Sequence, residues 1–235
     1  MRGSTRKSKQ TPQHPVSAVL EYTGYSERYN KKLASLLVPG FTSNASAAAA
    51  RIAAPFAAAA ALNEAYFGAP REEVVYRGLS VSRTNEPGSA QALRPPRPGQ
   101  TWWMERIWST TSDASVAHDI MDPTPDSTCL LLRLTLPRGY PRVDVSPFLQ
   151  SFLADPSRFV YANQKEVLLV PFAPGFAWRG PQLWRVTAVV PGTEVGLHAR
   201  LRDVAKAVAH RQRVAKRAYR DNVTAFTLLE MEPVE

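Results

Sequence analysis

The chain has 235 residues and a formal net charge of +9, with 44% hydrophobic and 21% charged residues. This composition supports a packed core and excludes general disorder, while Cys129, the only cysteine, excludes a disulfide framework and a cysteine-rich zinc site. The 20 prolines favour loops and edge strands over a helical bundle. No apolar run reaches the ~18 residues of a membrane helix and no signal peptide is visible, so we expect a soluble protein without membrane contact.

The positive charge is concentrated in two segments. Residues 1–14 carry four bases and no acid, and we expect them to form a disordered tail. Residues 198–220 carry eight bases and one acid, Asp203, with apolar residues at helical spacing. This pattern predicts an amphipathic helix with a solvated basic face. Basic segments also attract phosphate backbones, so contact with nucleic acid through them stays open.

The first part of the chain is predicted to be a helical lobe over residues 15–70. Residues 16–37 have an apolar period near 3.6 that stops at a Val-Pro-Gly sequence. Residues 45–67 are rich in alanine, and Pro55 among them predicts a pair of helices.

The rest of the chain, residues 71–235, is predicted to form a β-sandwich core. A β-rich run at 73–77 is expected to stop at Gly78, and a short helix is expected at 113–120 with Asp113 at its cap. Further strands are predicted at 102–111, 129–136, 142–145, 166–171, 177–178, 183–190 and 224–230. Helices followed by strands indicate an α+β fold, which we expect to be one domain over residues 15–235.

Three short motifs carry candidate chemistry. Arg77 and Gly78 end the first strand, where a planar guanidinium can bind a diphosphate and glycine lets a ligand approach the backbone. Ser109-Thr110-Thr111 supplies hydroxyls that can hold a carboxylate or a ribose, or cap the following helix. Gln164 and Glu166 stand two apart at the start of a strand, which predicts that they share a face. Each motif alone also fits an ordinary turn, helix cap or strand start.

Taken in order, the three motifs resemble the R-S-E class of mono-ADP-ribosyltransferases, which carry Arg, Ser-Thr-Ser and Glu/Gln-x-Glu on successive strands. The resemblance extends to residues 22–33, similar to the family's Tyr…Asn-x-x-Leu helix, and to residues 113–117 and 170–176. It covers roughly residues 20–180. It implies an ADP-ribosyltransferase fold, in which two packed β-sheets form an NAD cleft beside the N-terminal helical lobe.

The resemblance implies that NAD is the substrate, that no metal is needed, and that ADP-ribose is transferred to a macromolecule with release of nicotinamide. Water in place of the acceptor would give NAD hydrolysis. Arg77 would hold the NAD phosphates, and Gly78 would offer backbone groups to the nicotinamide amide. Ser109 would orient the catalytic Glu166, with Thr110 near the nicotinamide ribose. Glu166 would stabilise the positive charge that develops on that ribose.

Gln164 bears on the acceptor. A glutamine amide cannot take a proton from a guanidinium, but it can hydrogen-bond another amide or a base edge. The Gln-x-Glu motif is similar to that of Rho-modifying exoenzymes, which act on asparagine, and of pierisin-like enzymes, which act on guanine. Those relatives carry an aromatic residue where Tyr161 stands. Asparagine, glutamine or guanine, in a protein or a nucleic acid, is therefore favoured over arginine as the acceptor.

Two departures from the family's pattern and one alternative function remain. The third hydroxyl residue is Thr111 instead of serine, which is a mild change. Residues 112–128 contain no aromatic residue, so stacking on nicotinamide is expected either to come from Trp102, Trp103 or Trp108 or to be weaker. The alternative function is a nucleic-acid-binding or virion-structural protein with an inactive transferase fold, which the basic segments motivate. The leading hypothesis implies a toxin, effector or viral protein, located in the cytoplasm of the producing or target cell or carried in a virion.

Overall fold

Two long helices precede a β-rich remainder. The computed structural model describes residues 14–36, 43–82, 96–104, 106–121, 127–155, 165–170, 183–214 and 223–234. The helices are α1 (Pro15–Leu36), α2 (Ser43–Phe67), α3 (Ala114–Ile120), α4 (Val145–Phe152) and α5 (Arg202–Val214), and two short 3-10 segments, η3 (Gly192–Leu197) and η4 (Ala199–Leu201), lead into α5. The strands are β1 (Glu73–Ser82), β2 (Thr101–Trp103), β3 (Trp108–Thr111), β4 (Ser127–Leu136), β5 (Arg142–Asp144), β6 (Glu166–Leu169), β7 (Leu183–Pro191) and β8 (Thr227–Pro233).

Hydrogen bonds link these strands into one eight-stranded sheet in the order β2-β7-β8-β4-β1-β3-β6-β5. The pairing is antiparallel except between β4 and β8. β1 pairs with β4 along its whole length, whereas it pairs with β3 at one register position, Tyr76↔Thr111. The sheet therefore consists of two halves, β5-β6-β3 and β1-β4-β8-β7-β2, joined at a single position.

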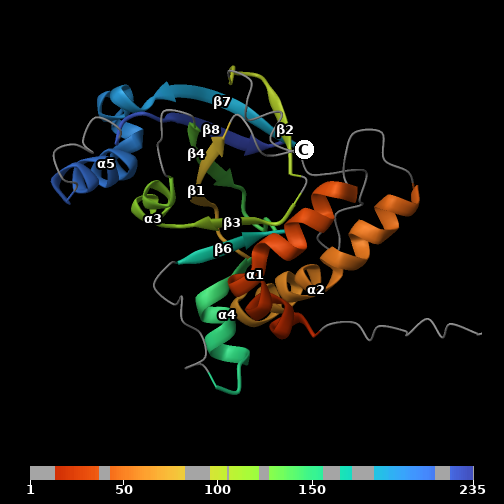
Figure 1. Cartoon of the computed structure of the whole chain (residues 1–235). Helices are drawn as coiled ribbons and strands as arrows, with labels where there is room; N and C mark the ends of the chain where they lie inside the picture. Colours follow the sequence, from red (N-terminus) through yellow and green to blue (C-terminus); the bar gives the residue numbers. More distant parts are fainter. Residues whose placement is uncertain are drawn as a thin grey trace, which may run out of the picture.

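The two halves pack against each other over a central apolar core. Trp108 and Leu169 from one half share this core with Leu132 and Trp184 from the other, and the Trp108 and Trp184 ring centroids lie 5.7 Å apart. Figure 1 shows β7 and β8 above and β3 and β6 below, with β1 and β4 between them. The α+β fold with N-terminal helices and packed strand layers is thus confirmed.

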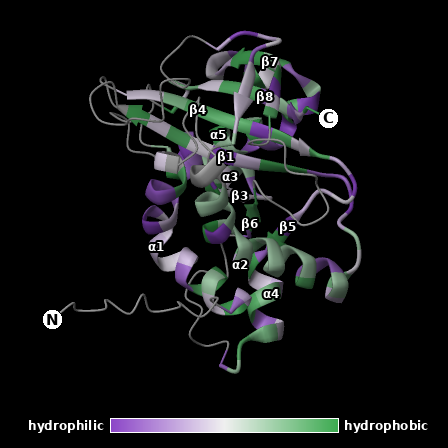
Figure 2. Ribbon diagram, turned by 90° about the vertical axis from the view of Figure 1, so that its right-hand side faces the viewer, coloured by the Kyte–Doolittle hydropathy of each residue, from purple (hydrophilic) through white to green (hydrophobic). Residues whose placement is uncertain are grey.

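Helices cover the outer face of each half, because strand side chains alternate between the two faces. Ile107, Val143 and Leu168 pack against α1, α2 and α4, and this cluster forms the lower part of the molecule in Figures 1 and 2. On the other half, Tyr76 and Leu131 pack against α3 and α5. In the described residues no helix has the length and apolar character needed to cross a membrane.

The prediction of a helix pair at residues 45–67 is wrong, because α2 is continuous through Pro55. A proline inside a helix removes one hydrogen bond and costs about 3 kcal/mol. Buried residues on one face of α2, Ala53, Phe56 and Ala60 among them, pack in the same core as α1. We attribute the continuity of α2 to this packing, which the local sequence does not reveal.

The prediction that Gly78 ends the first strand is also wrong. β1 continues through Gly78 to Ser82. A Cβ atom at Gly78 would lie 2.1 Å from the carbonyl oxygen of Ala117 and 2.9 Å from Cγ of Met121. Glycine is required here because α3 crosses β1 at close range, and not because the chain turns.

The remaining predicted elements differ from the structure mainly in their bounds. The helix at 113–120 is confirmed, and Asp113 caps it by accepting a hydrogen bond from the Ser115 backbone N–H. The predicted strand at 102–111 is two strands, β2 and β3, in different halves of the sheet. α4 was not predicted. Residues 1–13, 177–178 and 215–222 and the site candidates Tyr161 and Gln164 lie outside the described residues.

We expect the Gly78→Ala variant to lower the free energy of unfolding by about 3 kcal/mol, because the added methyl group would overlap the Ala117 carbonyl. Urea denaturation measures this change. Gly24→Ala in α1 is the matched control, since no atom lies within 4 Å of the Cβ it would gain. Equal stability of Gly78→Ala and the wild type would contradict the close approach of α3.

Candidate active site

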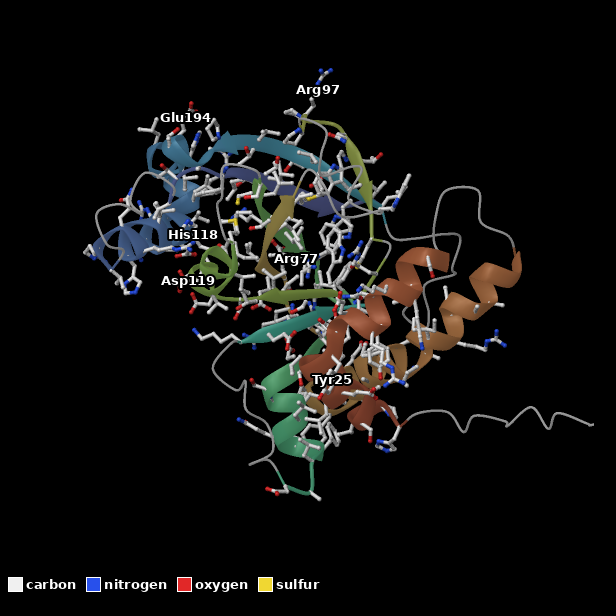
Figure 3. All side chains as sticks on the ribbon, viewed as in Figure 1. Tyr25, Arg77, Arg97, His118, Asp119 and Glu194 are labelled. Atoms are coloured by element: carbon white, nitrogen blue, oxygen red, sulfur yellow. The ribbon has the colours of Figure 1, made fainter. Side chains whose placement is uncertain are left out.

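Arg77, Ser109 and Glu166 are brought together by β1, β3 and β6. In the antiparallel β3–β6 ladder Thr111 pairs with Glu166, so Ser109 and Glu166 are diagonal neighbours on one face. The Ser109 hydroxyl donates a hydrogen bond of 2.5 Å to Oε1 of Glu166. Arg77 Nη1 donates one of 2.5 Å to the Ser109 carbonyl oxygen. Guanidinium, hydroxyl and carboxylate thus gather around Ser109, and Figure 3 shows Arg77 near the centre of the molecule.

This polar set lies on the side of the sheet that faces α1. Leu168, which shares a strand face with Glu166, packs in the core with α1. Tyr22 of α1 donates a hydrogen bond from its hydroxyl to the carbonyl oxygen of Ile107 at 3.0 Å and accepts one from Asn30 Nδ2 at 3.0 Å. The buried Tyr22 therefore ties α1 to the residues just before Ser109.

The sequence places Tyr22 and Asn30 only in a helix similar to the family's. It does not predict their roles, because the partner of Tyr22 is a backbone carbonyl 85 positions away along the chain. The signal available in the sequence was the presence of polar side chains on an otherwise buried helix face.

Burial dominates the electrostatics of the site. Glu166 is only 9% exposed, and burial raises the pKa of its carboxyl, while the Ser109 hydrogen bond and the charge of Arg77 partly oppose that rise. Burial likewise lowers the pKa of Arg77, and it raises the pKa of Tyr22 to about 12. The buried surroundings screen charges only weakly. Opposite charges there interact strongly with each other and with any charge that develops between them.

Thr110 lies on the other face of β3 from Ser109. It is 3% exposed, and its hydroxyl donates a hydrogen bond of 2.7 Å to the Val167 carbonyl oxygen. Its side chain therefore links β3 to β6 on the side of the central core. The Thr110 hydroxyl thus faces away from Ser109 and Glu166, and its place near the nicotinamide ribose stays an expectation.

Gly78 lies where the two halves of the sheet separate. Its backbone pairs with Leu131 of β4 on one side. On the other side β1 and β3 pair at Tyr76↔Thr111, two residues earlier. Arg77 and Gly78 thus directly follow Tyr76, the residue of β1 that pairs with β3 and so holds Ser109 close to β1.

Two of the tryptophans expected near nicotinamide are core residues. Trp102 is 4% exposed and Trp108 is 6% exposed, and both belong to the central core. The expectation that either one stacks on nicotinamide is wrong, because packing between the sheet halves already covers them. Trp103 lies on β2, the strand at the end of the sheet, opposite Leu183 of β7.

The prediction that Gln164 and Glu166 share a strand face assumes an extended backbone at Lys165 between them. β6 begins at Glu166, and Lys165 before it has φ of 46°, which is left-handed and not extended. Period-two alternation applies only to extended backbone. Gln164 and Tyr161 themselves lie outside the described residues, so their roles remain expectations.

A cavity of about 380 Å³ lies elsewhere, at the start of β1 and β5. Its lining includes Asn63, Phe67, Glu73, Arg142 and Asp144. None of the predicted site residues that the structure describes lines it. Among the described residues no group of three or more histidine, cysteine, aspartate or glutamate side chains could hold a metal ion.

No protein-family model and no curated protein matches the sequence. Solved structures do match the fold, which is that of bacterial ADP-ribosyltransferase toxins. The catalytic domain of VahC from Aeromonas hydrophila is 16% identical, with 94% of this chain and 97% of that one covered and a TM-score of 0.51. The Clostridium limosum C3 exoenzyme is 11% identical, with 94% and 85% covered and a TM-score of 0.51. Plx2a, an ADP-ribosyltransferase toxin from Paenibacillus larvae, is 12% identical, with 94% and 86% covered and a TM-score of 0.49.

We expect Ser109→Ala to raise the pKa of the Glu166 carboxyl further, because the hydroxyl stabilises the ionised form. Carbon-detected NMR titration of labelled glutamate side chains measures this directly. Ser35→Ala is the control, since the Ser35 hydroxyl bonds only the Lys32 carbonyl on the exposed side of α1. An unchanged Glu166 titration in Ser109→Ala would show that this hydrogen bond does not form in solution.

Proposed function

We propose that this chain is an NAD-dependent mono-ADP-ribosyltransferase of the R-S-E class, acting as one domain over residues 15–235. The observation that carries the proposal is that two hydrogen bonds of 2.5 Å link Arg77, Ser109 and Glu166. The three residues come from separate strands, and their order along the chain is that of the family's motifs. The fold shared with ADP-ribosyltransferase toxins supports the same proposal.

In this proposal the Arg77 guanidinium binds the NAD diphosphate, and Gly78 offers backbone groups to the nicotinamide amide. The bond between the ribose and nicotinamide breaks, and its electron pair leaves with nicotinamide. Positive charge then develops on the ribose, which the fixed Glu166 carboxylate stabilises. The nucleophile of the acceptor supplies the electron pair of the new bond and loses its proton. Ser109 keeps the carboxylate in one orientation throughout.

Burial of Glu166 adds a pH dependence to this mechanism. The carboxyl must be ionised to stabilise a cation, and burial raises the pKa at which it ionises. The rate therefore falls as the pH drops through this raised pKa, at a higher pH than an exposed glutamate would give.

For the acceptor we propose a macromolecule that offers asparagine, glutamine or guanine. The support is the amide at Gln164 in the Gln-x-Glu motif, together with the aromatic residue Tyr161 three positions earlier. An amide can donate and accept hydrogen bonds with each of these groups, but it cannot deprotonate a guanidinium. The proposed activity is that of a toxin or effector.

We expect Glu166→Gln to lower the rate of nicotinamide release from NAD by about 100-fold or more, because the neutral amide cannot stabilise the developing cation. Fluorescent or radiolabelled NAD reports the release. The wild-type rate should also fall at acidic pH, whereas the residual rate of the variant should not follow that titration. Glu64→Gln on α2 is the control and should match the wild type. Equal release by Glu166→Gln and the wild type would refute the proposal.

A second candidate function, contact with nucleic acid, is supported by the exposed face of α5. Val204, Ala207 and Val208 bury the inner face. The outer face carries exposed Arg202, Lys206, His210 and Arg213, which stand four, four and three residues apart and so form one stripe along the helix. Within the described part of the chain, none of these four side chains forms an ion pair.

A buried apolar face also distinguishes α5 from a helix that inserts into a lipid surface, which needs its apolar side free. A row of basic side chains on a rigid helix suits a phosphate backbone. We therefore propose nucleic acid as the partner of this stripe, whether as the acceptor or as a binding site beside the transferase activity.

Replacing Arg202, Lys206 and Arg213 together by glutamine should weaken binding to a short DNA duplex. It should also flatten the salt dependence of that binding, because each lost phosphate contact lowers the slope by ~0.9. Fluorescence anisotropy across a salt series measures both effects. Replacing Arg28, Lys31 and Lys32 on α1 removes the same charge and is the control. If both triple variants had the same salt-dependence slope, the basic stripe of α5 would not contact DNA.

A further inference from the structure

Lys165, the residue directly before Glu166, has a strained backbone. Its φ is 46°, and it is the one non-glycine residue with positive φ in the described part of the chain. Lysine is disfavoured in this region, since its Cβ crowds the backbone and its side chain offers none of the local hydrogen bonds that asparagine makes. Such a conformation persists only when neighbouring groups impose it.

Two consecutive residues after β3 hold Lys165 in this conformation. The Ser112 backbone N–H donates a hydrogen bond of 3.3 Å to the Lys165 carbonyl oxygen. The Lys165 ammonium group lies 3.1 Å from Oδ2 of Asp113 and donates a hydrogen bond to it. The backbone and the side chain of Lys165 are thus anchored on the same short segment.

Asp113 is itself held firmly. Its Oδ1 accepts a hydrogen bond of 3.0 Å from the Ser115 backbone N–H as the cap of α3, and its own N–H donates to the Thr111 hydroxyl. Hydrogen bonding from Ser115, followed by the interaction with Lys165, lowers the pKa of the Asp113 carboxyl, which is therefore ionised at neutral pH. α3 in turn packs directly on Gly78.

The ion pair is not explained by stability. The Lys165 side chain is 62% exposed and that of Asp113 is 32% exposed, and pairs at such positions contribute little to folding. Glu166 also has its own anchor, the Ser109 hydroxyl. Fixing Lys165 therefore acts mainly on its own backbone, whose left-handed φ directly precedes Glu166, the first residue of β6.

We propose that Asp113 and Lys165 form a positioning pair that sets how the ADP-ribosyl group is divided between the macromolecular acceptor and water. This inference rests on the proposed function, in which Gln164, the next residue toward the N-terminus, contacts the acceptor. When the ribose–nicotinamide bond breaks, either the acceptor or water supplies the electron pair of the new bond and releases a proton. Loss of the Asp113–Lys165 pair leaves cleavage of the ribose–nicotinamide bond intact. It changes only the position of the macromolecular acceptor.

Two charge-removing variants test the pair. Asp113→Asn keeps a residue that caps helices well but loses the charge, and Lys165→Gln loses the ammonium group. For each variant, nicotinamide release without acceptor and incorporation of labelled ADP-ribose into acid-insoluble material of a cell lysate are measured in parallel. We expect incorporation to fall about fivefold or more and nicotinamide release to stay within about twofold of the wild type. The double variant should be no worse than either single one, because the two residues act as one unit.

Three further variants complete the experiment. Lys165→Arg keeps the cation and should retain incorporation, while Lys165→Gly removes the backbone strain but also the anchor and should behave like Lys165→Gln. Lys31→Gln removes an exposed ion pair with Glu27 on α1 and should change neither rate.

The outcomes separate the two proposals. Incorporation that is unchanged in Asp113→Asn and Lys165→Gln, or that falls in parallel with nicotinamide release, overturns the positioning pair alone. A wild type that releases no nicotinamide, or that releases it without labelling any lysate component, overturns the proposed transferase and the inference with it. Melting temperatures equal to the wild type show that the variants are folded.

Discussion

The structure depends on the single position at which its two sheet halves are hydrogen-bonded, Tyr76↔Thr111. The halves are also held by apolar packing, which includes Trp108 against Trp184, and by polar contacts such as the ion pair of Arg142 with Glu73 at 2.7 Å. Beyond the junction β1 and β3 diverge, so polar side chains of both strands can approach one another without closing a ladder between them. Arg77 reaches the Ser109 carbonyl there, and Ser109 reaches Glu166. A fully paired β1–β3 ladder would occupy these backbone groups and leave no place for a ligand.

Burial of Glu166 makes the stability of the fold depend on pH. Burial raises the pKa of Glu166, so the native state favours its protonated form. The stability gained from that protonation is present at pH values below the unfolded pKa and is lost as the pH rises through the folded one. Ionisation of the buried Glu166 carboxyl is thus achieved at the expense of stability. This is typical of residues that are selected for chemistry.

The fold likeness and the site geometry contribute different parts of the functional proposal. At 11% and 16% identity to the C3 exoenzyme and VahC, the likeness establishes the arrangement of helices and strands. The chemistry is argued from Arg77, Ser109 and Glu166, since one fold can support several functions. The acceptor is a further question. In our proposal the acceptor contacts Gln164, and the neighbouring Lys165 is fixed by its ion pair with Asp113 and by its left-handed backbone.

The sequence by itself determined the order of elements, the apolar strands and the three motifs, because period and residue type are local properties. The cap at Asp113 was also predictable, since it joins neighbours in the chain. Only the tertiary structure decided that Gly78 serves the approach of α3, that Trp102 and Trp108 belong to the core, and that Tyr22 bonds Ile107. It also revealed the strained Lys165. Each of these depends on contacts between residues far apart in the chain, whose energies outweigh local preference and leave no periodic trace in the sequence.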